Sequence, residues 1–104
     1  MADITFLATA PAIPGSATAG AGVYVGKLNG FTASLEGAFT GTYQLQISLD
    51  TAATPAAASW LNEGTALTAP GVVQCTKQAA WARWNCTAFT SAPTTCHLAG
   101  VNRV

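Results

Sequence analysis

The chain has 104 residues, of which four are basic and four acidic, so its formal net charge is zero and charged residues make up 8%. Soluble domains carry roughly 25% charged residues. The length suits one domain with one core, and the absence of excess positive charge argues against nucleic acid or an anionic membrane as a partner. A net charge near zero also favours association. The composition therefore favours a surface covered by partners over a neutral, stable monomer.

The first 22 residues differ in composition from the rest of the chain. Residues 3–7 predict a short strand, and residues 8–22 contain two prolines and three glycines without a regular apolar period. Such a stretch is typical of an extended arm or a long loop. We therefore divide the chain into an N-terminal strand and arm, 1–22, and a β-sandwich domain, 23–104. The side chains expected to contact a partner from this N-terminal strand and arm are Ile4, Phe6, Pro11, Ile13 and Pro14.

A hairpin signal follows the arm. Residues 23–28 predict a strand, and Asn29-Gly30 is the dipeptide that most strongly signals a short hairpin, since both residues accept a positive φ. Residues 31–39 alternate between apolar and polar positions, and Gly37 is expected to bulge or end that strand. The pattern therefore predicts that these two segments pair.

The segment 42–49 has the clearest strand pattern in the chain. Apolar side chains alternate strictly with amides and hydroxyls, which predicts one buried and one solvated face. The solvated face carries no charge before Asp50. The apolar positions are Tyr43, Leu45, Ile47 and Leu49.

The second half of the chain continues with short strands. Residues 51–59 fit either a short helix or a loop that leads into a strand near residues 60–67. Strands are predicted at 72–76, 81–90 and 95–101, with turn residues between them.

These segments predict an all-β fold. About seven to eight short strands with turn signals every 8–12 residues are typical of an antiparallel β-sandwich. We expect a single sandwich of jelly-roll or Ig-like type with an extended N-terminal arm or loop. No long helix is available to connect parallel strands.

The sequence offers little catalytic chemistry. His97 is the single histidine, and Cys75, Cys86 and Cys96 lack the spacing of a zinc knuckle. The odd number of cysteines and the absence of a secretion signal favour buried, free thiols. We therefore expect no enzyme activity, no metal and no cofactor.

The tryptophans allow three uses. Trp81 and Trp84 fall on opposite faces of the strand 81–90, so at most one of them can lie on a given outer face. Core packing is expected for two of the three tryptophans, and an aromatic anchor at a protein interface comes next. An exposed aromatic platform would instead favour sugar stacking.

The order of motifs across residues 39–100 resembles that of small bacteriophage virion proteins. The motifs are FTGTYQLQISLD at 39–50, then Trp60, then TALTAPG at 65–71 and WARWNCTAFTSAPTTCHLAG at 81–100. The chain departs from those proteins in the segment after Asp50, where TAATPAAAS replaces a tight glycine turn, and the first 38 residues do not match.

The resemblance implies a structural role in a virion. It implies a capsid decoration or cement protein that binds the major capsid protein at the capsid surface, is made in the host bacterial cytoplasm, and self-associates as a homo-oligomer, a dimer or trimer. The alternatives are a tail, baseplate or fibre component and a carbohydrate-binding β-sandwich module. Neither nucleic acid nor a membrane is an expected partner.

Overall fold

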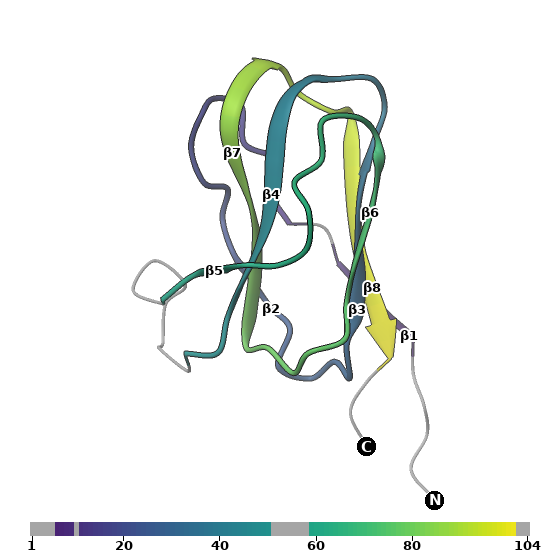
Figure 1. Cartoon of the computed structure of the whole chain (residues 1–104). Coiled ribbons are helices and arrows are strands. Elements are labelled where there is room, and N and C mark those ends of the chain that lie inside the picture. Colours follow the sequence, from purple (N-terminus) through teal and green to yellow (C-terminus); the bar gives the residue numbers. More distant parts are fainter. Residues whose placement is uncertain (1–5, 10, 51–58, 102–104) are drawn as a thin grey trace, which may run out of the picture.

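The computed structural model describes residues 6–9, 11–50 and 59–101, and of residues 6–9 it describes the backbone. These residues form eight strands and no helix, so none of their segments is a helix that could cross a membrane. Figure 1 shows the strands as two packed layers. The strands are β1 (Phe6–Thr9), β2 (Val23–Tyr24), β3 (Phe31–Glu36), β4 (Thr40–Ser48), β5 (Leu61–Asn62), β6 (Gly71–Cys75), β7 (Trp81–Ser91) and β8 (Thr95–Val101).

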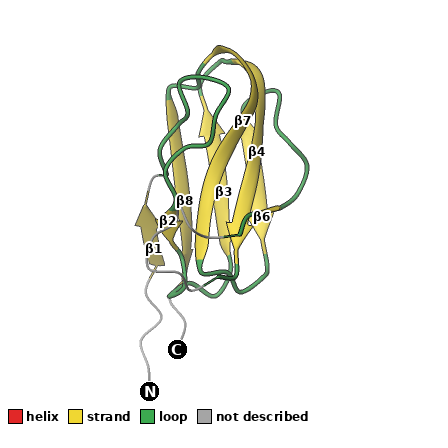
Figure 2. Ribbon diagram, turned by 90° about the vertical axis from the view of Figure 1, so that its left-hand side faces the viewer, coloured by secondary structure: helices red, strands yellow, loops and turns green. Residues whose placement is uncertain are grey.

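The strand order is that of a jelly roll. The first sheet has the order β1-β8-β3-β6 and the second sheet has the order β2-β7-β4-β5, with all pairs antiparallel. The pairs β1–β8, β2–β7, β3–β6 and β4–β5 are those of one long hairpin that has been wrapped around a core. Figure 2 looks onto the second sheet, with β7 and β4 in front of β3 and β8. The predicted antiparallel sandwich is confirmed, and its topology is the jelly roll of two Greek keys.

Period-2 alternation builds the core between the sheets. In β3, Phe31, Ala33 and Leu35 point inward while Thr32 and Glu36 are exposed. The first sheet contributes further inward side chains from β6 and β8. The second sheet contributes its own inward set from β4 and β7, which consists of Tyr43, Leu45, Ile47, Ala82, Trp84 and Cys86.

Two local expectations about the strands were wrong. Asn29-Gly30 does not close a hairpin, because β2 pairs with β7 and β3 pairs with β6 and β8, so this turn connects the two sheets. Gly30 has a φ of 80° and Asn29 has no positive φ, which fits one left-handed position rather than the two of a type I′ turn. Leu49 is 59% exposed, because β4 ends at Ser48.

Other boundaries follow the glycine signals. Gly37 has a φ of 85° directly after β3, so it ends that strand rather than bulging it. The extra residues lie instead in β7, whose register against β4 shifts between Thr40 and Gly41 and again between Thr42 and Tyr43. The alternative helix at 51–59 falls mainly on residues 51–58, which lie outside the described residues.

The segment expected to be an arm packs on its own domain. Pro11 and Pro14 are buried, and Ile13 packs against the core. The Tyr43 hydroxyl donates a hydrogen bond to the Pro14 carbonyl at 3.1 Å, and the Cys96 thiol donates one to the Pro11 carbonyl at 2.8 Å. The described part of the segment, 11–22, therefore closes one side of the sandwich.

The end of this segment also extends the second sheet. The amide of Gly20 donates to the Trp84 carbonyl at 2.8 Å, and the amide of Cys86 donates to the Thr18 carbonyl at 2.9 Å. Ala19 thereby forms an isolated antiparallel bridge with Asn85. The sequence of this segment did not predict these contacts, because its prolines and glycines interrupt the apolar–polar alternation without preventing local pairing.

Candidate functional site

A polar cluster lies on the outer face of the first sheet. Ser34 in β3 is the cross-strand partner of His97 in β8, and Glu36 lies two residues further along β3. The Ser34 hydroxyl donates to Glu36 Oε2 at 2.9 Å and accepts from the His97 backbone N–H at 3.1 Å. The His97 Nδ1 contacts the same carboxylate oxygen. The bond from His97, and then the bond from Ser34, hold the pKa of Glu36 below its usual value.

This cluster has a serine, a histidine and an acid, but it is not arranged as a catalytic triad. In a triad the imidazole lies between the hydroxyl and the carboxylate, so that it can take the hydroxyl proton. In the described contacts, Ser34 donates to Glu36, and its bond to His97 comes from the backbone amide. The cluster therefore provides a cross-strand polar link, in which the Ser34 hydroxyl donates to the Glu36 carboxylate and not to the imidazole.

The three cysteines are buried and free, as the sequence predicted for the thiols. Burial raises the pKa of Cys75 to about 11 and also raises the pKa of Cys96, which keeps both as thiols at neutral pH. His97 points away from its neighbour Cys96, since the two alternate along β8. The described residues contain no group of three or more His, Cys, Asp or Glu placed to hold a metal ion.

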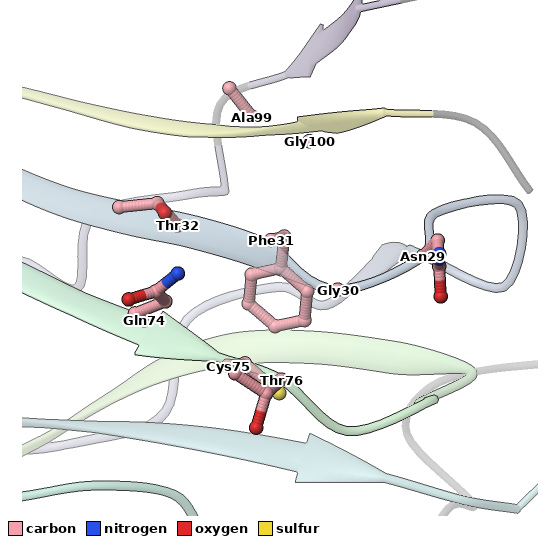
Figure 3. A pocket seen from close by; sticks show the side chains of 9 residues that line it. All are labelled: Asn29, Gly30, Phe31, Thr32, Gln74, Cys75, Thr76, Ala99 and Gly100. Carbon is pink, nitrogen blue, oxygen red and sulfur yellow. The ribbon is translucent and has the colours of Figure 1, made fainter. Parts of the chain in front are cut away.

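A shallow hollow of about 300 Å³ lies across β8, β3 and β6 near the turn at Gly30. Figure 3 shows Thr32 beside Gln74, its cross-strand partner, with Ala99 on the neighbouring strand. The groups exposed here are hydroxyls and amides, because the thiol of Cys75 belongs to a buried side chain. The hollow can bind neutral polar groups by hydrogen bonds but offers no acid or base.

The outer face of the second sheet carries a different set of side chains. Tyr24 and Trp81 are cross-strand partners whose rings meet edge to face, with centroids 5.2 Å apart. Trp60, directly before β5, stacks on the Arg83 guanidinium at 4.2 Å from the ring centroid. We call this surface the aromatic face, and it comprises Tyr24, Trp60, Trp81, Arg83, Gln46 and Asn62.

A hydrogen-bond relay runs through the aromatic face. Arg83 Nε donates to Gln46 Oε1 at 2.8 Å, and Gln46 Nε2 donates to Asn62 Oδ1 at 3.0 Å. These residues belong to β7, β4 and β5, and they are aligned by the strand register. Burial lowers the pKa of Arg83, although an arginine remains charged at any physiological pH.

The sequence anticipated part of this surface. Trp81 and Trp84 lie on opposite faces, as the alternation along 81–90 predicted, and the structure shows that Trp84 is the one in the core. The relay and the approach of Trp60 to Arg83 were not predicted, because they depend on which strands become neighbours. These residues can be recognised as neighbours only when the strand register of the jelly roll is known.

The residues predicted to contact a partner lie elsewhere. Ile4 falls outside the described residues, and Phe6 is in β1, where the backbone alone is described. Pro11 and Pro14 are buried in the domain itself and Ile13 packs against its core, and their contact with a partner stays a prediction. An apolar residue flanked by prolines can pack on a partner or on its own domain, and the sequence pattern does not distinguish the two.

No protein-family model, curated protein or solved structure matches this chain. The function is therefore inferred from the fold and from the chemistry of the two outer faces.

Proposed function

We propose that this chain is a structural virion protein of a bacteriophage, a capsid decoration or cement protein that binds the major capsid protein at the outside of the head shell. The observation that supports this most directly is the charge content of the strands. Among all residues of β1 to β8, the formally charged ones are Glu36 and Arg83. Ionic groups are costly to desolvate, so a sandwich with so few of them can be covered by neighbours at low cost.

The outer face of the first sheet is the better candidate for contact with the shell. Thr32, Gln74 and Thr95 are exposed there, and Val72 is 64% exposed at the β6 edge. These side chains are uncharged and stand on a regular sheet, and the Glu36 carboxylate on the same face is paired with His97. Depletion of charge is the compositional mark of an interface core. A shell presents many identical sites, which suits the proposed dimer or trimer because symmetric oligomers repeat one contact.

The proposal is tested on purified particles that contain this chain. Its copy number relative to the major capsid protein should be of the same order, and the isolated protein should cosediment with particles stripped of it. Thr32→Lys places a cation in the proposed contact. Burying that charge without a partner should weaken retention on the particles about tenfold or more. Asn62→Lys, on the other sheet, should leave retention unchanged.

Three outcomes would contradict the proposal. A copy number of a few per particle would assign the chain to a tail, baseplate or fibre. Failure of the unmodified protein to cosediment would remove the shell as a partner. An equal effect of the two lysine substitutions would mean that the first sheet is not the contact face.

A carbohydrate-binding module is the second candidate, and a specific observation favours it. The aromatic face combines the exposed Tyr24 ring and the half-buried Trp60 and Trp81 rings with hydrogen-bonding groups, which is the combination that binding sites for small polar ligands use.

A further inference from the structure

The aromatic face is built from two parallel rows of side chains. Tyr24, Trp81 and Ser48 are aligned across β2, β7 and β4, and Arg83, Gln46 and Asn62 are aligned across β7, β4 and β5. Tyr24 is 56% exposed, whereas Ser48 is fully buried. One row is therefore mainly aromatic and the next is polar, and both belong to the same regular sheet.

The relay in the polar row has a fixed direction. A guanidinium can only donate, so Gln46 must accept from Arg83 through Oε1 and must donate to Asn62 through Nε2. Asn62 then accepts through Oδ1, which leaves its amide N–H groups for a partner. Arg83 uses Nε in this relay, and the hydrogen bonds of the described residues leave its terminal N–H groups unused. The polar row thus offers donors and needs acceptors.

Because Arg83 is positively charged, the acceptor that it favours is an anion. Its described contacts are a neutral amide and an indole ring, and the two ion pairs of the described residues, Lys77–Glu63 and His97–Glu36, do not include it. A partly buried cation is stabilised by an anion that can accept two parallel hydrogen bonds, which a carboxylate does. A ligand carboxylate on Arg83 would also lie beside the Trp60 ring.

We propose that the aromatic face binds a carbohydrate that carries a carboxylate, with a sugar ring against Tyr24 and Trp81 and the carboxylate on Arg83 and Asn62. This activity goes beyond attachment to a shell and belongs to the opposite face of the sandwich. Sugar hydroxyls and carboxylates supply the acceptors that the polar row requires, and the apolar side of a sugar ring fits an aromatic side chain.

A protein partner on this face would have to supply an acceptor for Arg83 as well as cover the rings. A stable protein interface buries about 800 Å² on each side and uses Tyr, Trp and Arg at its centre, but a charge buried there needs a partner group. On the aromatic face, Arg83 stands on β7, an inner strand of the sheet, against the Trp60 ring and two residues along the strand from Trp81. A small ligand that pairs with the cation avoids the cost of burying it unpaired.

The test uses the isolated full-length protein and oligosaccharides of glucuronate, galacturonate and sialic acid. Each is compared with its counterpart in which the carboxyl group is reduced to a hydroxymethyl group. Binding is followed by tryptophan fluorescence and by retention on the immobilised sugars. At least one carboxylated oligosaccharide should bind, and its reduced counterpart should bind about tenfold more weakly, as the loss of one charge-assisted pair implies.

Substitutions assign the binding to this face. Tyr24→Ala should weaken binding of both forms about tenfold, while Tyr24→Phe retains it. Arg83→Lys keeps the charge but loses the planar fork, so the ratio of binding of the carboxylated form to binding of the reduced form should fall. Gln74→Ala, on the first sheet, is the matched control and should leave binding as in the unmodified protein. Circular dichroism confirms that each variant is folded.

The proposal is overturned if no oligosaccharide binds, if the reduced forms bind as well as the carboxylated ones, or if Gln74→Ala weakens binding as much as Tyr24→Ala. Loss of retention on particles in Tyr24→Ala without any sugar binding would assign the face to a protein partner and would also overturn it. Because the sugar experiment uses no particles, its failure leaves the proposed decoration function standing.

Discussion

The outer faces of the two sheets are made by the same alternation but carry different chemistry. On the first sheet, β3 and β8 present Thr32, Ser34 and Thr95, whose side chains are short, together with the Glu36–His97 pair. On the second sheet, β2 and β7 present the rings of Tyr24 and Trp81. The period of the sequence fixes only that these residues point outward, whereas their size and hydrogen-bonding groups decide what each face can bind.

The two faces also differ in how far their polar side chains satisfy one another's hydrogen bonds. Ser34, Glu36 and His97 satisfy one another within a cluster that is largely exposed to solvent, so their net contribution to stability is small. On the second sheet, the relay from Arg83 to Asn62 spans three strands and leaves donors unused among the described contacts. A face with satisfied groups suits broad, low-cost contact, and a face with unused donors suits a specific ligand.

The largest expected effect comes from removing the core that both faces share. Trp84 is fully buried between the sheets, and Trp84→Ala should lower the free energy of unfolding by about 3–5 kcal/mol, because it removes a large apolar side chain and leaves a cavity. Urea denaturation followed by circular dichroism measures the change. Shell retention and sugar binding should be lost together; loss of one without the other would show that the faces do not depend on one core.

A smaller effect is expected from residues 11–22, which we call the strap because they contact both sheets at one side of the sandwich. Tyr43→Phe removes the hydrogen bond from its hydroxyl to the Pro14 carbonyl at 3.1 Å. Burial raises the pKa of Tyr43 to about 12, so the hydroxyl is a donor at neutral pH. The free energy of unfolding should fall by about 1 kcal/mol. An unchanged value would mean that residues 11–22 contribute little to the domain, as an arm would.

Acid should distinguish the two carboxylates. Glu63 is buried, and its hydrogen bond to Lys77 at 2.8 Å lowers its pKa from the usual 4.5; Glu36 has a lowered pKa through His97 but is exposed. A carboxylate with a lowered pKa in the folded state stabilises the protein above its unfolded pKa, and this contribution is lost as the pH falls through the folded value.

The measurement is the free energy of unfolding at pH 7 and near pH 3 for both glutamine variants. Glu63→Gln should flatten the loss of stability between these values more than Glu36→Gln, because solvent screens the exposed pair. A larger flattening in Glu36→Gln would reverse the comparison and make the first-sheet cluster the stronger one.

The smallest effect is expected from Trp81→Phe. The Trp81 Nε1 is buried and has no hydrogen-bond partner in the described structure, so the substitution removes no described bond and relieves a desolvated N–H. The free energy of unfolding should change by less than about 1 kcal/mol. A loss of several kcal/mol would show that Trp81 acts mainly as packing, and would separate it from Tyr24 as a surface ring.

The sequence by itself determined the class of fold. Alternation in 31–36, 42–48 and 81–86 sets one side chain inward and the next outward, and this local rule holds in whatever sheet the strand joins. It therefore predicted the antiparallel sandwich and the placement of Trp81 and Trp84 on opposite faces of one strand, but not which of the two is buried. It also predicted buried thiols, since small apolar side chains at inward positions have no other place.

Only the tertiary structure decided which strands are neighbours. Asn29-Gly30 has the local preference for a hairpin, but the pairing of β2 with β7 and of β3 with β6 and β8 overrides it, because long-range burial outweighs the preference of one turn. The tertiary structure also decided how residues 11–22 lie, for which the sequence allowed an extended arm or a long loop: they pack on the sandwich through the carbonyls of Pro11 and Pro14. It also brought Arg83, Gln46 and Trp60 together from separate strands, since a cross-strand contact is a property of the register and not of any single segment.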